Sequence, residues 1–452
     1  MTAEIAGLPF WELTFDAEGD PDAGQRDAFL AEVPGRGLTD LVVFSHGWNN
    51  DRRIANALYA RFFGLLAGQL PAGSRGSVGL VGVVWPSQRW SDEPIPDFAT
   101  DGGAVTGGGV AALGEIGAEA APASPTLDAT TLADLRALFP SATAPLEEMA
   151  HLLEGPPSDE AQAEFHRCLG EFSRLAAAGD PTDGEDDAGT GLKDGEPRML
   201  LDDHRVLFER YRDALVAQGV VVGDSGGGTA GFGDVFGGVL NGAKEALRQA
   251  TYWQMKNRAG TVGRAGLGPL LGRLPAGVRV HLVGHSFGAR LVSFALAGLP
   301  AGSSPVRSVT LLQGAFSHFA FADPLPFDAN RRGALAGMLD RIDGPLVTCF
   351  STHDGAIGTF YPLASLAAQE DAAGAQDALF RWGGMGADGA QGVDAVLEAI
   401  RPAGARYDFA PGTACNVDAS EVVCHGNPPS GAHSDIVHPE LTWVVLAAGA
   451  LV

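Results

Sequence analysis

Short apolar runs recur along the chain at long intervals, and segments with helical periodicity lie between them. Runs that are apolar throughout predict strands buried on both faces, as in a parallel sheet with helices on each side. We therefore expect an α/β fold with a mostly parallel, doubly wound sheet, whose first strand forms an antiparallel edge. The predicted strands occupy residues 10–15, 41–45, 78–85, 278–283, 306–313, 345–351 and 414–423.

The interval between residues 85 and 278 is far longer than an ordinary crossover connection between neighbouring strands. We interpret residues 96–250 as a largely helical cap or lid, and residues 1–95 with 251–452 as the α/β core. Residues 179–198 are polar, acidic and rich in glycine, which predicts a disordered loop because they hold too little apolar surface to order themselves. Helical patterns in the insertion occupy residues 132–138, 145–153, 160–178 and 202–218.

One further segment, residues 236–250, places its apolar residues at helical spacing. This pattern predicts a helix with one apolar face. We favour the interpretation that this helix packs on the sheet ahead of the strand at 278–283, and a mobile lid or a lipid-facing helix is the alternative. The apolar positions are Phe236, Val239, Leu240, Ala243, Leu247 and Ala250.

The strand predicted at 278–283 leads into a Gly-His-Ser-Phe-Gly turn, and an apolar helical pattern follows at once. This order of strand, turn and helix is the context that a nucleophile elbow requires, with Ser286 at its tip. A second Gly-x-Ser-x-Gly match surrounds Ser225, and a chain with 63 glycines produces such matches by chance. No helical pattern directly follows Ser225, so we interpret it as a loop residue and predict Ser286 as the nucleophile.

A carboxylate follows the strand predicted at 345–351. Active sites of parallel sheets form at the carboxyl ends of the strands, which is where Asp354 lies in the sequence. We therefore predict Asp354 as the acid that orients the catalytic histidine. Asp323, at the exit of the preceding strand, is the alternative.

The general base is expected among the histidines that follow the acid, because a parallel sheet with a nucleophile elbow places nucleophile, acid and base in that chain order. His433 lies in a loop of small residues after the last predicted strand and before an apolar helix that starts near Pro439. We predict His433 as the base, with His438 and His425 as alternatives. Asp435, in the same loop, is interpreted as a loop cap.

A sharp His-Gly-Trp turn follows the strand predicted at 41–45. Acyl transfer needs two backbone N–H groups that bind the oxyanion, one after the nucleophile and one after an early strand. We predict Phe287 and Trp48 as these oxyanion-hole donors. We interpret His46 as a structural histidine that holds the turn through its ring nitrogens, in preference to a role in proton transfer.

Together these motifs make the chain resemble the α/β-hydrolase superfamily, most closely its lipase-like and esterase-like members. The resemblance covers the core on both sides of the insertion. It implies a serine hydrolase that cleaves carboxylic esters, with lipids or other hydrophobic esters as the first expectation, and that needs no metal or organic cofactor. A thioesterase or amidase would use the same residues, and a non-catalytic interaction protein is the remaining alternative.

The position of the insertion predicts that it covers Ser286 and decides which esters are accepted. Its helix at 236–250 would then line an acyl pocket with Phe236, Leu240 and Leu247. A cap with such an apolar face would also allow transient contact with lipid or a membrane.

The composition and charge of the chain restrict which binding partners and which cellular compartment we expect. The formal net charge is -25, which argues against nucleic acid as a partner. The N-terminus has no signal-peptide pattern and no apolar run has membrane-spanning length, so the cytoplasm is the default expectation and signal-less export the alternative. The four cysteines are too scattered for a disulfide framework, although Cys415 and Cys424 could pair in an exported protein. The oligomeric state stays open.

Overall fold

A computed structural model gives the fold of most of the chain. The loop predicted at 179–198, Ser225 and the side chain of Phe236 lie outside the described residues. Residues 232–239 and 359–360 are described by their backbone alone. The described residues are 3–87, 90, 126–156, 158–176, 200, 202–217, 232–302, 304–360, 383–427 and 430–452.

The centre of the molecule is a nine-stranded sheet in which every described pair of neighbouring strands is parallel except the first. This confirms the α/β class and the mostly parallel sheet. In spatial order the strands are β1 (Ala3–Ile5), β2 (Leu8–Thr14), β4 (Val78–Val84), β3 (Asp40–Ser45), β5 (Arg279–His285), β6 (Val306–Leu312), β7 (Leu346–Phe350), β9 (Ala414–Asp418) and β8 (Ala395–Ala399).

The two ends of the sheet differ from the sequence-based expectation. The strand predicted at 10–15 is β2, which pairs in parallel with β4, so the prediction of an antiparallel edge there is wrong. That edge is β1, which turns back onto β2 through Ala6 and Gly7, both with positive φ. The opposite edge, β8, was not predicted, because it is short and largely exposed and therefore shows no apolar run. The strand predicted at 414–423 ends earlier, at Asp418.

Helices cover both faces of the sheet because its strands carry apolar side chains on both sides. Leu41 and Val43 of β3 belong to a core shared with α1 (Ala23–Glu32) and α9 (Phe287–Gly298). Val42 and Phe44 point the other way, into a second core with α2 (Arg52–Gln69) and α13 (Pro439–Ala448). The alternation of buried residues along one strand thus divides the interior into two layers.

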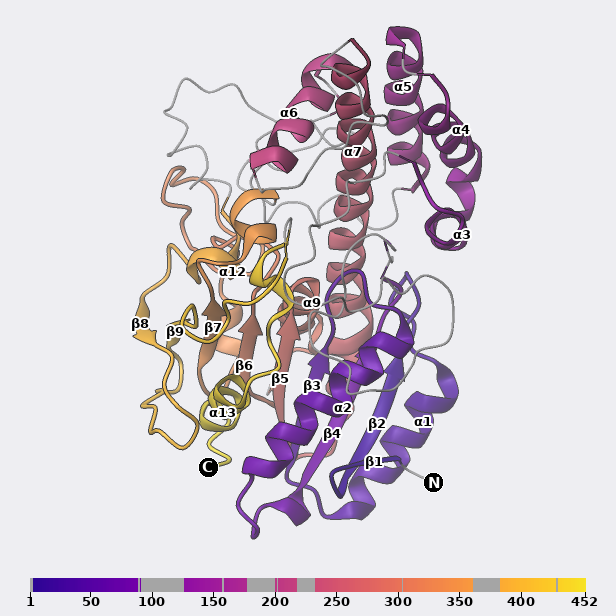
Figure 1. Ribbon diagram of the computed structural model, residues 1–452. Helices are drawn as coiled ribbons and strands as arrows, with labels where there is room; N and C mark the ends of the chain where they lie inside the picture. The colour runs from indigo at the N-terminus through magenta and orange to yellow at the C-terminus, as the bar shows by residue number, and fades with distance from the viewer. Residues whose placement is uncertain are drawn as a thin grey trace.

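A group of helices stands beyond the carboxyl ends of the strands (Figure 1). It comprises α3 (Ala129–Leu138), α4 (Thr143–Glu154), α5 (Asp159–Ala176), α6 (His204–Ala217) and the first part of α7 (Phe232–Thr261). The first four confirm the helices predicted from the sequence.

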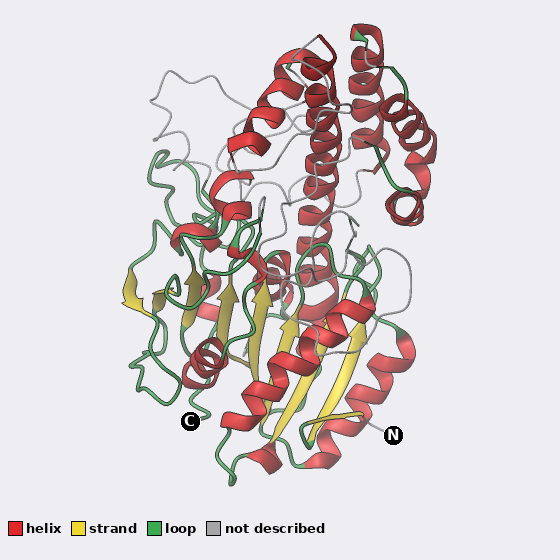
Figure 2. Cartoon of the chain, viewed as in Figure 1, coloured by secondary structure: helices red, strands yellow, loops and turns green. Residues whose placement is uncertain are grey.

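The long helix α7 joins this group to the sheet layers (Figure 2). It continues without interruption through residue 250, the predicted boundary, into a π-helical turn (Val262–Leu267) and α8 (Gly268–Leu271) beside α9. The chain therefore runs from the group of helices to the sheet layers as one continuous helix. Within the described parts of the chain, no helix combines the length and apolar character that crossing a bilayer requires.

Candidate active site

Ser286 occupies the turn between β5 and α9, at the carboxyl edge of the sheet. Its backbone angles are φ 56 and ψ -122, a conformation that is unfavourable for a residue with a side chain. The flanking glycines make the turn possible. A Cβ at Gly288 would lie 2.1 Å from the Ser45 carbonyl oxygen, and one at Gly284 would lie 2.4 Å from the Gly288 carbonyl oxygen. This local strain holds the serine at the tip of the turn.

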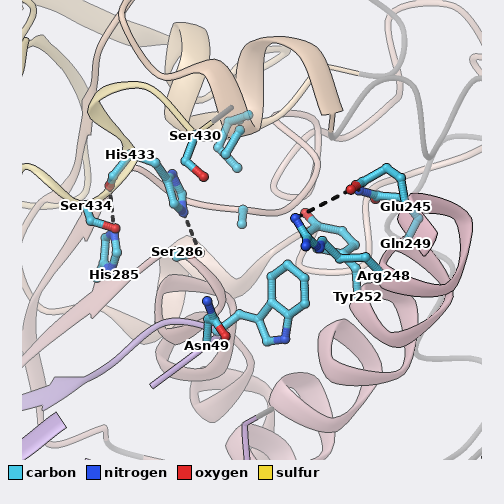
Figure 3. A pocket seen from close by; sticks show the side chains of 14 residues that line it. Asn49, Glu245, Arg248, Gln249, Tyr252, His285, Ser286, Ser430, His433 and Ser434 are labelled. Atoms are coloured by element: carbon cyan, nitrogen blue, oxygen red, sulfur yellow. Dashed lines mark hydrogen bonds and ion pairs between the residues drawn. The ribbon is translucent and has the colours of Figure 1, made fainter. Parts of the chain in front are cut away.

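The three residues predicted as nucleophile, base and acid lie in hydrogen-bond contact. His433 Nε2 is 2.8 Å from Ser286 Oγ (Figure 3). On the other side of the ring, His433 Nδ1 is 2.8 Å from Asp354 Oδ2. A carboxylate can only accept a hydrogen bond, so the Nδ1–H of His433 donates to Asp354. The Nε2 atom then carries the lone pair that accepts the hydroxyl proton of Ser286.

The carboxylate of Asp354 is buried and held from two sides. Its Oδ1 accepts the backbone N–H of Ile357 at 2.9 Å, and its Oδ2 also accepts from Gln313 Nε2 at 3.2 Å. These donors fix the orientation of the carboxylate. Sequence reasoning missed Gln313, although it directly follows β6 at the same edge of the sheet, and that position was an available signal.

The loop that carries His433 is tied to the core. Gly431 forms a bridge with Asp354, and the N–H of Ala432 donates to the His353 carbonyl oxygen at 2.9 Å. The imidazole Nε2–H of His285 donates to the carbonyl oxygen of His433 at 2.8 Å. Burial lowers the pKa of His285 to about 3, so this ring is neutral at physiological pH. His285 therefore positions His433, a contact that the sequence motif alone did not reveal.

The alternative base and acid residues have other partners. His438 Nε2 lies 2.6 Å from Asp435 Oδ1, and His425 lies 3.3 Å from Asp435 Oδ2. Asp435 also accepts the backbone N–H of His425 at 2.9 Å and so holds the loop. Asp323 has a half-exposed side chain and pairs with Arg332 at 3.8 Å.

The two predicted oxyanion donors lie beside Ser286. Phe287 is the first residue of α9, and the first N–H groups of a helix have no carbonyl partner within that helix. Trp48 follows Gly47, and a Cβ at Gly47 would lie 2.6 Å from Ser286 Cβ, so the turn touches Ser286. The rings of Trp48 and Phe287 are 6.3 Å apart. The turn after β3 and the start of α9 thus meet at Ser286.

His46 holds this turn in place. Its Nδ1 contacts the Gly47 carbonyl oxygen at 2.8 Å, its Nε2 accepts the Trp85 N–H at 3.4 Å, and its ring stacks on Trp85. Burial lowers the pKa of His46 to about 4, which keeps the ring neutral. His46 therefore holds the turn through its ring nitrogens, as the sequence predicts.

Ser286 and His433 open into a pocket of about 60 Å³, whose opposite wall is α7 (Figure 3). The expectation that Leu240 and Leu247 line this pocket is wrong. Both are buried in the core, where the apolar face of α7 packs against neighbouring helices, and the polar face points to Ser286 instead. The pocket is lined by Trp48, Asn49, Glu245, Arg248, Gln249, Tyr252, His285, Ser286, Ala315, Ala356, Ile357, Ser430, His433 and Ser434.

Metal-ligating residues do not cluster in the part of the chain that the structure describes, where no group of three could hold an ion. Cys415 is buried, Cys424 is exposed, and both are free thiols. Comparison with protein-family models, curated proteins and solved structures finds no match to this chain.

Proposed function

We propose that the protein is a serine hydrolase of the α/β-hydrolase superfamily that cleaves carboxylic esters through an acyl-enzyme on Ser286. The observation that carries this proposal is the position of His433, whose ring nitrogens lie 2.8 Å from the Ser286 hydroxyl and 2.8 Å from the Asp354 carboxylate. The strained turn of Ser286 at the carboxyl edge of a parallel sheet supports it further. A structural serine has no need of that strain.

The residues would act in two half-reactions. Ser286 Oγ attacks the ester carbonyl carbon while His433 Nε2 takes the hydroxyl proton, and the N–H groups of Phe287 and Trp48 bind the resulting oxyanion. The carbon–oxygen bond to the alcohol then breaks, and His433 returns the proton to the leaving oxygen. Water repeats the sequence: His433 takes its proton, the hydroxide attacks the acyl-enzyme, and the proton returns to Ser286 as the acid leaves.

The helices beyond the sheet edge would form the cap of this enzyme. In support, α7 closes the pocket opposite Ser286 with four of its side chains. A cap that touches the substrate selects it, while the triad supplies the chemistry. Substrate preference would therefore change with α7, and reactivity toward small reagents would stay with Ser286.

A fluorophosphonate probe tests the proposal, because it reacts covalently only with an activated serine. We expect the wild-type protein to be labelled on the peptide that contains Ser286, as read by mass spectrometry, and Ser286→Ala to remain unlabelled. Ser225→Ala, at the other Gly-x-Ser-x-Gly match, is the control and should be labelled like the wild type. Absence of labelling in the folded wild-type protein would overturn the proposal.

A further inference from the structure

Gln313, the residue that directly follows β6, has an unusual backbone conformation. Its φ is 49, in the left-handed region that a residue with a side chain rarely adopts. Two backbone bonds hold this turn. The N–H of Gln313 donates to the Cys349 carbonyl oxygen at 3.0 Å, and the Gly314 carbonyl oxygen accepts from Gly386 at 2.8 Å. A Cβ at Gly386, in α12 (Met385–Asp388), would lie 2.6 Å from the Gln313 carbonyl carbon. Contacts with other elements thus impose a locally unfavourable conformation.

The side chain of Gln313 is buried, and only one of its two polar atoms is paired. The residue is 1 % exposed, and its Nε2 donates to Asp354 Oδ2 at 3.2 Å. Its Oε1 is buried and has no hydrogen-bond partner among the residues that the structure describes. An unpaired buried acceptor lowers the stability of a fold, and an apolar side chain of the same length would avoid that loss. The amide is therefore better explained by its effect on Asp354 than by packing.

The carboxylate of Asp354 needs a donor on each oxygen to hold its plane. The torsion that rotates a carboxylate about its Cβ–Cγ bond is broad and has no sharp preference of its own. The backbone N–H of Ile357 holds Oδ1 at 2.9 Å, and Gln313 holds Oδ2. This second oxygen also accepts the Nδ1–H of His433. Among the bonds that the structure describes, removal of Gln313 would leave Oδ2 fixed only by the imidazole that it has to orient.

We propose that Gln313 is a positioning residue, whose amide fixes the oxygen of Asp354 that orients His433, and that the chain retains it at a loss of stability. This inference rests on the proposed hydrolase function. Gln313 is not among the residues that line the pocket, so it acts through Asp354 and His433 and does not touch the substrate. If the carboxylate rotates, His433 spends less time in the orientation that accepts the Ser286 proton. A small misplacement of a catalytic group can lower a rate about 100-fold.

Two glutamine-to-methionine variants of the full-length protein test this role. Gln313→Met removes the donor at similar volume and should lower kcat for p-nitrophenyl acetate about 10- to 100-fold. KM should stay within about twofold of the wild-type value, because the residues that line the pocket are unchanged. Gln254 is the control, since it is 5 % exposed and its amide donates to the Ser173 carbonyl oxygen at 3.3 Å. Gln254→Met should keep the wild-type kcat and KM.

A proton resonance separates positioning from a structural role. The proton on His433 Nδ1 is bonded to a carboxylate and should appear far downfield in the proton NMR spectrum of the wild type. Its absence in His433→Gln assigns it. We expect this resonance to be lost in Gln313→Met, where the carboxylate rotates, and to be unchanged in Gln254→Met.

Urea denaturation tests the second half of the proposal. The midpoint of Gln313→Met should equal or exceed that of the wild type, because the unpaired Oε1 is gone. Gln254→Met should unfold at a lower urea concentration, because it leaves the Ser173 carbonyl oxygen without its donor. The two substitutions should therefore have opposite effects on activity and on stability.

A second variant replaces the donor without changing the shape of the side chain. Gln313→Glu places a carboxylate beside Asp354, and at pH 8 the two carboxylates repel each other. We expect it to lower kcat at least as far as Gln313→Met does. Wild-type kcat in either Gln313 variant would overturn the inference. A lower urea midpoint in Gln313→Met, with the downfield resonance unchanged, would also overturn it, because the residue would then be purely structural.

These outcomes are distinct from failure of the hydrolase proposal. Labelling of Ser286 by the fluorophosphonate, together with full activity in Gln313→Met, would reject only the role of Gln313. If the probe does not label Ser286 in the folded wild-type protein, the hydrolase proposal fails, and the inference fails with it.

Discussion

The Ser286 triad, formed with His433 and Asp354, lies at the carboxyl ends of the strands, and a similar cluster lies near their amino ends. There His281 Nδ1 lies 2.9 Å from Ser308 Oγ, and His281 Nε2 lies 2.9 Å from Asp40 Oδ1. The residue types and the contact distances are nearly the same in the two clusters. The ring nitrogens are exchanged, because Nε2 faces the serine at His433 and Nδ1 faces it at His281. Residue types and contact distances alone therefore do not separate a candidate catalytic triad from a structural cluster.

The backbone and the surroundings separate the two clusters. Ser308 lies inside β6 and is 1 % exposed, and a salt bridge from Arg279 at 2.7 Å holds the Asp40 carboxylate. Ser286 instead occupies a strained turn and lines a pocket. Nucleophilic catalysis thus needs a backbone that presents the hydroxyl to a cavity, in addition to the right three side chains.

The largest expected difference between the clusters concerns the two serines. Ser286→Ala should lower kcat for p-nitrophenyl acetate by about four to six orders of magnitude, because triad members act as a unit. Ser308→Ala should leave kcat unchanged and lower the free energy of unfolding by about 1 kcal/mol, the net value of one buried hydrogen bond. Initial rates and urea denaturation measure the two effects. Full activity in Ser286→Ala would move the nucleophile elsewhere.

The two aspartates should differ in the same way. Asp354→Asn should lower kcat about 10⁴-fold, because an amide no longer holds the Nδ1–H tautomer of His433. Asp40→Asn should leave kcat unchanged and lower the free energy of unfolding by about 2 kcal/mol, less than for a fully buried pair because Arg279 is half exposed. A loss of activity in folded Asp40→Asn would contradict the assignment of that cluster as structural.

The smallest expected effect is a pH dependence of stability set by buried histidines. Burial lowers the pKa of His281, and it lowers those of His46 and His285 to about 4 and about 3. Because these folded-state values lie below the unfolded value of about 6.5, the stability is complete above that pH and is lost as the pH falls toward them. Each histidine should contribute up to about 1.4 kcal/mol per pH unit.

Denaturation midpoints between pH 7.5 and pH 4.5 measure this slope. His281→Gln and His46→Gln should each reduce it, since one proton fewer is taken up on unfolding. His425→Gln, whose parent side chain is 79 % exposed, is the control and should keep the wild-type slope. Stability that does not change over this range would mean that the buried rings are protonated in the native state.

Local patterns in the sequence were sufficient for the class of fold and for several parts of the candidate site. The apolar runs predicted the central parallel strands because a strand buried on both faces must be apolar throughout. The turn at Ser286 could be predicted because its close backbone contacts require the two flanking glycines. His433 and Asp354 were predicted from chain order and strand ends, and the structure places His433 against Ser286 and Asp354 against His433.

Other features depend on contacts between distant segments, which no local pattern encodes. The pairing of β2 with β4 places β2 inside the sheet, and His285 acts on a carbonyl 148 residues further along the chain. The helix α7 shows most clearly what the sequence alone left undecided. Its sequence determined that one face is apolar and the other polar, but only the tertiary packing decided which face meets Ser286. The apolar face was expected there, yet α5 and α6 cover it, because burying apolar surface between helices excludes more water than lining a small pocket does.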